Sequence, residues 1–118
     1  DTSSSSNYIQ AGPYDLSASS AAFLGFDMWL NSEYDYDFAS LQVSTDGASF
    51  TTLDMIEPFY TGSSWSGDYG TEWMAALADL TAYTGAGMTT VYIRWVLDAD
   101  GSNTEAGFYI DNMEIFAP

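Results

Sequence analysis

The chain has 118 residues, of which 47% are hydrophobic and 17% aromatic, so it can bury the core of a single domain and is not a disordered segment. Its formal net charge is −16, from 17 acidic residues against a single arginine, which argues against binding to nucleic acid or to anionic membranes. No apolar run is long enough to cross a bilayer, and the absence of His, Cys and Lys excludes the usual triads, Schiff bases and zinc sites, so we expect no enzyme.

The N-terminal segment is rich in serine. Residues 1–7, with the sequence DTSSSSN, predict a linker or a frayed end, and the domain is therefore expected to span residues 8–118. A short strand is expected to begin at Tyr8, and the Gly12-Pro13 pair is expected to end it.

Residues 21–31 form the first strong strand pattern. One face of this strand is predicted to carry Phe26, Met28 and Leu30. Asp27 falls on the other face, beside Trp29, and a carboxylate inside such a run needs a partner. We favour a hydrogen bond from a hydroxyl group on a neighbouring strand over a role as a metal ligand.

A hairpin is predicted next. Residues 38–44 alternate between apolar and polar side chains, and the inward positions are Ala39, Leu41 and Val43. Asp46-Gly47 favours a tight turn, because glycine accepts the positive φ that such a turn requires. Residues 49–55 are expected to return as the hairpin partner.

Three further strands are predicted in the second half. Residues 73–80 contain good helix formers but are few, and we assign a strand followed by one helical turn. Residues 89–97 are β-branched and aromatic throughout, which is typical of a strand. Residues 107–116 close the domain by simple alternation. One face is expected to hold Phe108, Ile110, Asn112 and Glu114, and the other Tyr109, Asp111, Met113 and Ile115.

No helix of normal length can be assigned, and strands do not alternate with helices. Short strands separated by turn residues predict an all-β fold, an antiparallel β-sandwich. The high negative charge suits salt water, where counterions screen surface repulsion, and predicts a marine or halophilic bacterium as the source. The chain begins with Asp and shows no signal peptide, so we expect an excised or matured piece of a longer protein.

Two acidic segments are candidate calcium sites. Glu33, Asp35 and Asp37 alternate along an extended segment, so they lie on one side and repel one another. Calcium takes about six to eight oxygen ligands and would neutralise them. The alternative is a hydrated acidic rim that protons and sodium screen. We favour at least one structural Ca²⁺, because the chain offers only one arginine.

The second segment, residues 98–103, has the sequence DADGSN and resembles the opening of a calcium loop. Its oxygen-bearing candidates are Asp98, Asp100 and Asn103. The glutamate that closes an EF-hand loop is missing and strands flank the segment, so an EF-hand is excluded. A loop that holds a hard cation and a solvated acidic loop both remain open.

Arg94 lies inside the best predicted strand. A lone arginine in a strand is typically a structural clamp that forks onto a carboxylate, and Asp111 or Asp37 is the expected partner. Residues 57–71 form a predicted loop rich in Gly and Ser that also carries aromatic side chains. These are the candidate ligand-binding residues for sugar rings, Tyr60, Trp65 and Tyr69, although such rings also commonly fold back over a core edge.

The order E-x-x-Y-D-x-A-x-L-x-V-S-T-D-G, then V-x-I-R-W, then D-G-S and G-F-Y-I-D-N resembles the MAM-like jelly-roll modules of secreted bacterial peptidases of the immune-inhibitor-A type. Related jelly rolls occur in bacterial adhesins and carbohydrate-binding modules. The resemblance covers residues 8–116. It implies a non-catalytic jelly roll, extracellular and often calcium-bound, with Glu33, Asp37 and Asp111 as candidate ligands or clamp partners. The absence of Lys and the acidic insertion at residues 98–100 depart from the pattern.

Three hypotheses follow for the function. The first is a calcium-stabilised module of a secreted or cell-surface bacterial protein that binds glycan or a protein surface through the loop aromatics, without membrane insertion. The second is a structural accessory domain that stabilises or orients a neighbouring secreted peptidase domain of a multidomain parent. The third, a hydrolase using the carboxylates of Glu33 and Asp37 alone, is disfavoured because nothing in the sequence marks a substrate cleft.

Overall fold

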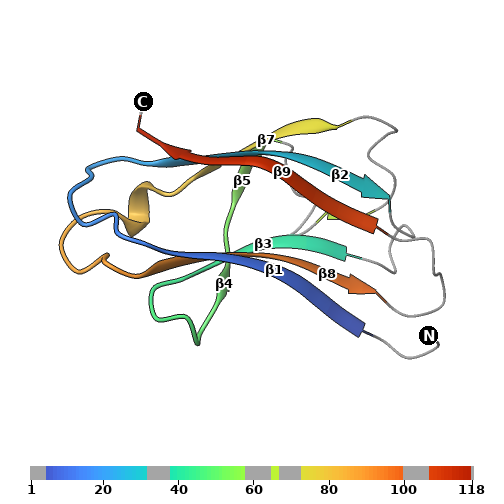
Figure 1. Cartoon of the computed structure of the whole chain (residues 1–118), viewed down its shortest axis with the longest axis horizontal. Coiled ribbons are helices and arrows are strands. Elements are labelled where there is room, and N and C mark those ends of the chain that lie inside the picture. Colours follow the sequence, from blue (N-terminus) through green and yellow to red (C-terminus); the bar gives the residue numbers. More distant parts are fainter. Residues whose placement is uncertain (1–4, 32–37, 58–64, 67–72, 100–106, 118) are drawn as a thin grey trace.

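Two antiparallel β-sheets pack face to face in the computed structural model, which describes residues 5–31, 38–57, 65–66, 73–99 and 107–117 (Figure 1). Sheet A has the order β1 (Ser5–Tyr14), β8 (Val91–Ala99), β3 (Phe38–Ser44) and β4 (Thr51–Thr52), and β6 (Trp65–Ser66) also pairs with β3. Sheet B has the order β5 (Met55–Glu57), β7 (Met74–Asp79), β2 (Phe23–Asn31) and β9 (Gly107–Phe116).

The strand order confirms the predicted jelly-roll sandwich. Neighbours within a sheet come from distant parts of the chain, as β1 with β8 and β2 with β7 do, and successive long strands alternate between the two sheets. A short 3₁₀ helix, η1 (Thr81–Tyr83), follows β7 and confirms the predicted helical turn. Within the described ranges, no helix is long and apolar enough to span a membrane.

The core lies between the sheets, and period-2 alternation places its side chains there. The inward residues predicted for β3 are confirmed, since Ala39, Leu41 and Val43 are each at most 1% exposed. Phe26 from β2 meets Trp95 from β8 edge to face, with ring centroids 5.5 Å apart, and so joins the two sheets.

Strand β1 is longer than the sequence predicts. It begins at Ser5, and the backbone of residues 5–7 pairs with residues 97–99 of β8, so these residues are not a linker. Gly12-Pro13 does not end the strand. The register shifts between Ala11 and Tyr14, and Gly12 takes a φ of 118°, which glycine alone adopts readily. The pair therefore makes an irregularity within one strand.

The turn after β3 forms as predicted, but the returning strand does not. Gly47 has a φ of 78°. Thr51 and Thr52 pair with β3, the N–H of Leu53 donates to Leu41 O of β3 at 2.8 Å, and the chain then crosses to sheet B as β5. The physical reason is apolar burial. Leu53 and Met55 are 6% and 4% exposed, so the segment closes one side of the sandwich with its side chains in the core.

Strand β9 has the predicted bounds, but its alternation is wrong. Asp111 pairs with Asp27 and Glu114 with Gly25, so that two residues of β9 face one of β2 between these pairs. Asn112 sits at this bulge with a φ of 52°. The bulge reverses the faces beyond it, and the residues of β9 that pack on the core are Ile110, Met113 and Ile115.

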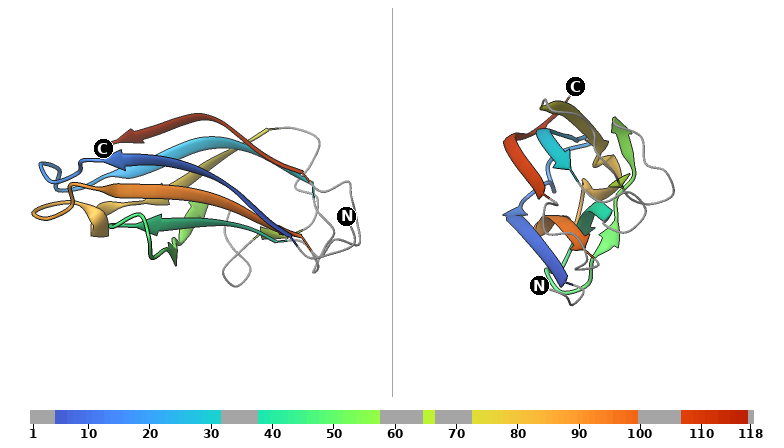
Figure 2. Two further views of the ribbon diagram at one scale, coloured as in Figure 1. Left: turned by 60° about the horizontal axis from the view of Figure 1, so that its bottom comes forward. Right: turned by 90° about the vertical axis from the view of Figure 1, so that its right-hand side faces the viewer.

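Several strand ends gather at one end of the sandwich (Figures 1 and 2). Asn31 at the end of β2 pairs with Gly107 at the start of β9. Phe38 at the start of β3 pairs with Asp98, near the end of β8. The backbone on either side of the two predicted acidic segments is therefore brought together.

Candidate functional site

The predicted calcium ligands fall mostly beyond the described residues. Glu33, Asp35, Asp37, Asp100 and Asn103 all lie in segments 32–37 and 100–106, of which nothing is described. Asp98 lies in β8, where its backbone pairs with both Ser6 and Phe38. Because Phe38 directly follows segment 32–37, the two acidic segments adjoin neighbouring strand ends.

Asp111, the remaining predicted ligand, is exposed on the outer face of sheet B. It stands opposite Asp27, and its Oδ1 accepts a hydrogen bond of 2.8 Å from the backbone N–H of Asn112. Asp27 Oδ2 accepts a 2.7 Å bond from Asn112 Nδ2, so its donor is an amide on a neighbouring strand instead of the predicted hydroxyl. In the described ranges, no three acidic, His or Cys side chains come close enough to hold a metal ion.

Arg94 is held by an amide oxygen and two aromatic rings. Its Nε and Nη2 donate to Gln10 Oε1 at 3.2 and 2.7 Å. The guanidinium carbon lies 3.9 Å from the centroid of the Tyr8 ring and 3.8 Å from that of Phe50. The side chain thus fastens β1 and the segment before β4 to β8.

The prediction of Asp111 as the partner of Arg94 is wrong, because the two residues lie on different sheets. Register explains the observed partner, since Gln10 stands directly opposite Arg94 in the β1–β8 pair. The other predicted partner, Asp37, lies outside the described residues. Sequence alone could not have chosen Gln10, because β1 and β8 are far apart in the chain.

The predicted sugar-binding residues are described only in part. Tyr60 and Tyr69 lie in the segments that are not described, and Trp65 is described only through its backbone, which pairs with Ala39. Sugar binding by Tyr60, Trp65 and Tyr69 therefore stays a prediction.

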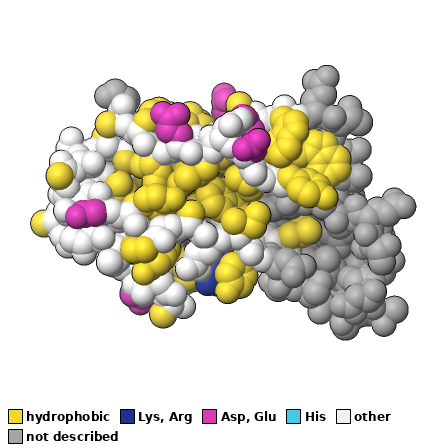
Figure 3. Space-filling view, in the orientation of Figure 1, with side chains coloured by type: hydrophobic (Ala, Val, Ile, Leu, Met, Phe, Trp, Pro, Cys, Tyr) yellow, Lys and Arg dark blue, Asp and Glu magenta, His cyan; other side chains and the backbone are white. Residues whose placement is uncertain are grey.

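A different aromatic surface is visible on sheet B. Trp29 on β2 pairs with Tyr109 on β9, and their ring centroids lie 5.3 Å apart with an angle of 53° between the planes. Trp73 directly precedes Met74, whose pairing with Met28 is the last in the β2–β7 ladder. Tyr109 is 56% exposed and Trp73 52%. We call these three residues the aromatic face. Figure 3, in the orientation of Figure 1, shows the edge of the sandwich, where a broad band of hydrophobic side chains lies between β9 and β1 with acidic side chains along its upper border.

Sequence reasoning missed the aromatic face. It placed Trp29 on the face opposite Phe26 and Met28, and it separated Tyr109 from Ile110, but it assigned neither Trp29 nor Tyr109 to an exposed face. Large aromatic side chains at outward positions were the available signal. Their adjacency depends on the pairing of β2 with β9, which the sequence does not reveal.

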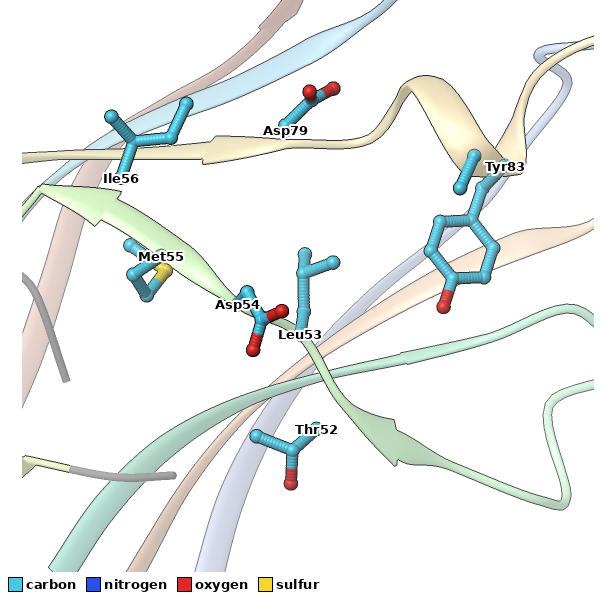
Figure 4. Close-up of a pocket in the computed structure, with 8 residues that line it drawn as sticks. Thr52, Leu53, Asp54, Met55, Ile56, Asp79 and Tyr83 are labelled. Carbon is cyan, nitrogen blue, oxygen red and sulfur yellow. The ribbon is translucent and has the colours of Figure 1, made fainter. Parts of the chain in front are cut away.

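A pocket of about 400 Å³ opens beside the crossover from β4 to β5 (Figure 4). It is lined by Thr52, Leu53, Asp54, Met55, Ile56, Asp79, Ala82 and Tyr83. Its two carboxylates come from different elements and are turned away from each other in Figure 4. The Thr81 side chain and backbone N–H lower the pKa of Asp79, with the N–H donating at 2.8 Å. The two carboxylates therefore line the pocket separately, without facing each other.

The fold defines this chain as a β-sandwich module. Comparison with known proteins relates its sequence to a metalloprotease precursor. No family model matches the chain. It is 30% identical over 105 residues to a protein named pre-pro-metalloprotease PrtV, in each of two strains of Vibrio cholerae serotype O1. The aligned region is 87% of this chain but only 11% of each relative. The chain is thus similar to a small portion of a metalloprotease precursor.

Proposed function

We propose that the chain is a non-catalytic, extracellular accessory module of a larger bacterial metalloprotease. The observation that carries this proposal is the alignment, which takes in most of this chain and about a ninth of the relative. The words "pre-pro" denote a leader and a pro-segment, which supports export. The chain has no His, so it cannot supply the paired His ligands by which many zinc proteases hold their metal.

We further propose that Ca²⁺ stabilises the module at the end where β3 starts and β8 finishes. Two facts support this. The pairing of Phe38 with Asp98 brings together the backbone beside both acidic segments. Arg94, the only basic side chain, is engaged by Gln10 and two rings on the outer face of sheet A. Neutralisation of the acidic segments therefore falls to an ion from outside the chain.

Two roles are compatible with such a module. Stabilising or orienting a neighbouring peptidase domain is better supported, because the relative is a metalloprotease precursor. Recognition of a glycan or a protein surface through Tyr60, Trp65 and Tyr69 rests on the sequence pattern. A glycan array with the chain and its Trp65→Ala variant separates the two roles, since only the second predicts a signal that the variant loses.

The calcium proposal is tested by thermal melts of the chain in excess chelator and in millimolar Ca²⁺, with Mg²⁺ at equal ionic strength as the control. We expect Ca²⁺ to raise the Tm by several degrees, because an ion that binds only the folded state stabilises it. Asp35→Asn with Asp37→Asn should abolish the increase. The matched control is Asp15→Asn with Asp54→Asn, which removes the same charge from exposed positions elsewhere. Equal melting in chelator and Ca²⁺ refutes the proposal.

The accessory role is tested in a metalloprotease precursor that contains this module, with and without it. We expect loss of the module to lower the yield of mature protease, while each mature molecule cleaves a short peptide substrate at an unchanged rate. The isolated module should cleave no peptide. A normal yield of protease without the module contradicts the accessory role.

A further inference from the structure

The aromatic face is an exposed binding surface that the proposed accessory role does not use. Trp73 and Tyr109 are each more than half exposed, and Trp29, on the strand between β7 and β9, is partly buried. Exposed aromatic side chains grouped on one surface and bordered by polar residues mark interaction sites in soluble proteins.

The charges bordering the aromatic face all have one sign. On the described outer face of sheet B, each charged side chain is acidic; Asp27 and Asp111 form the outward pair next to Trp29 and Tyr109, and Glu114 follows one outward pair further on. Asp27 and Asp111 stand directly opposite each other; Asn112 donates one hydrogen bond to each carboxylate, but it carries no charge, and like charges that face each other across two strands repel. The single arginine belongs to sheet A. A positively charged group from outside the chain is therefore the complementary ligand.

The same chain shows how such a cation can be held. Arg94 stacks against the rings of Tyr8 and Phe50 while a side-chain oxygen accepts two of its N–H bonds. On sheet B, the Trp29 and Tyr109 rings correspond to those of Tyr8 and Phe50. The carboxylates of Asp27 and Asp111 correspond to the amide oxygen of Gln10. Ionised acceptors bind a guanidinium more strongly than neutral ones do.

Geometry favours a peptide over a saccharide. The planes of Trp29 and Tyr109 are inclined at 53°, so a flat pyranose ring cannot stack on both rings at once, whereas a single cation can approach both. β9 is the edge strand of sheet B, so an extended peptide can lie alongside it. Tyr109 and Asp111 on β9 would then flank the incoming side chain.

We propose that the outer face of sheet B binds an extended peptide segment of a partner protein through an Arg or Lys side chain. The cation lies against the Trp29 and Tyr109 rings and is neutralised by Asp27 and Asp111. This binding does not depend on the relationship to a protease, and either proposal can fail without the other.

The test is a titration of the isolated chain with a short capped peptide that carries two Arg residues separated by Gly, followed by NMR of the β9 amides and the Trp indoles. A peptide with neutral citrulline in place of Arg is the ligand control. We expect Tyr109→Ala, and separately Asp27→Asn with Asp111→Asn, to weaken binding about tenfold. Tyr109→Phe should bind as the wild type does, since it keeps the ring.

Because the chain is strongly acidic, diffuse attraction must be separated from a site. Asp15→Asn with Asp54→Asn removes two exposed charges away from the aromatic face and should change affinity by less than about twofold. An equal loss in this control overturns the proposal, as does binding of the citrulline peptide or no binding at all. Tighter binding of a neutral oligosaccharide that Tyr109→Ala abolishes also overturns it and assigns the face to glycan.

Discussion

The side chain of Asn112 reaches from the bulge in β9 to Asp27 in β2, with 2.7 Å between Asn112 Nδ2 and Asp27 Oδ2. Asn112 has a φ of 52°, a conformation that asparagine tolerates better than most residues. The bulge also turns Met113 and Ile115 toward the core. One residue therefore sets the faces of the closing strand and donates a hydrogen bond to a carboxylate on the outer face of sheet B.

Substitution of Asn112 tests both of its roles. Asn112→Gly keeps the backbone conformation but loses the hydrogen bond, and Asn112→Ala loses both. We expect Ala to lower the free energy of unfolding by about 1–2 kcal/mol and Gly to lower it by less. Urea denaturation measures both values. If Gly is as harmful as Ala, the positive φ is not what selects asparagine here.

The turn after β3 is predicted to make stability depend on pH. Hydrogen bonds from the N–H groups of Ser49 and Ala48, then from the Ser44 hydroxyl, lower the pKa of Asp46 from 3.8 to about 2. A carboxylate with a lowered pKa in the folded state stabilises above its unfolded pKa, and this stabilisation is lost as pH falls through the folded pKa. Asp46→Asn should therefore lower the Tm at neutral pH, by an amount that shrinks between about pH 4 and pH 2.

Melting curves of the two proteins across that range check this prediction. Protonation of the other acids changes both proteins alike, so the difference in Tm is the quantity to follow. Asp54→Asn, at an exposed position outside the turn, is the control. A difference that stays constant down to pH 2 contradicts the role assigned to the Asp46 carboxylate.

The core is predicted to dominate stability. Leu24 is 0% exposed, while Ile9 on β1 is 51% exposed. Leu24→Ala should lower the free energy of unfolding by about 2–5 kcal/mol through lost burial and a residual cavity. Ile9→Ala should lower it by less than about 1 kcal/mol. Chemical denaturation compares them, and similar losses would mean that β1 packs differently from the structure.

The stacking of Arg94 on Tyr8 is measurable by a double-mutant cycle. Arg94→Met keeps an unbranched side chain without the charge, and Tyr8→Ala removes the ring. We expect a coupling energy of about 0.5–1 kcal/mol, because the guanidinium lies 3.9 Å from the ring centroid at a partly exposed site. Additive losses in the double variant would show that the contact contributes nothing beyond the separate packing of each side chain.

Local patterns predicted most of the strands. The alternation in residues 38–44 sufficed for β3, because one face of it is buried and the other is not. It failed in β9, where the bulge at Asn112 inserts one extra residue and shifts the pattern. The predicted hairpin also failed after Leu53, because the chain crosses to sheet B there and buries Leu53 and Met55 between the sheets.

The surfaces were harder to predict than the strands, because they depend on which strands are neighbours. Gln10 meets Arg94, and Trp29 meets Tyr109, across pairs of strands widely separated in sequence. The excess of acidic residues led to a carboxylate as the predicted partner of Arg94, whereas the observed partner is the amide oxygen of Gln10. Calcium binding at residues 33–37 and 98–103 stays a prediction.

The position of the only basic residue has a consequence for resistance to proteolysis. Proteases that cut after Lys or Arg find one bond in this chain, between Arg94 and Trp95, in a strand paired on both sides by β1 and β3. Cleavage there requires sheet A to open first. A trypsin-like enzyme would leave the folded module whole and cut the opened one into two pieces. The rate of that single cut would report directly how often the sandwich opens.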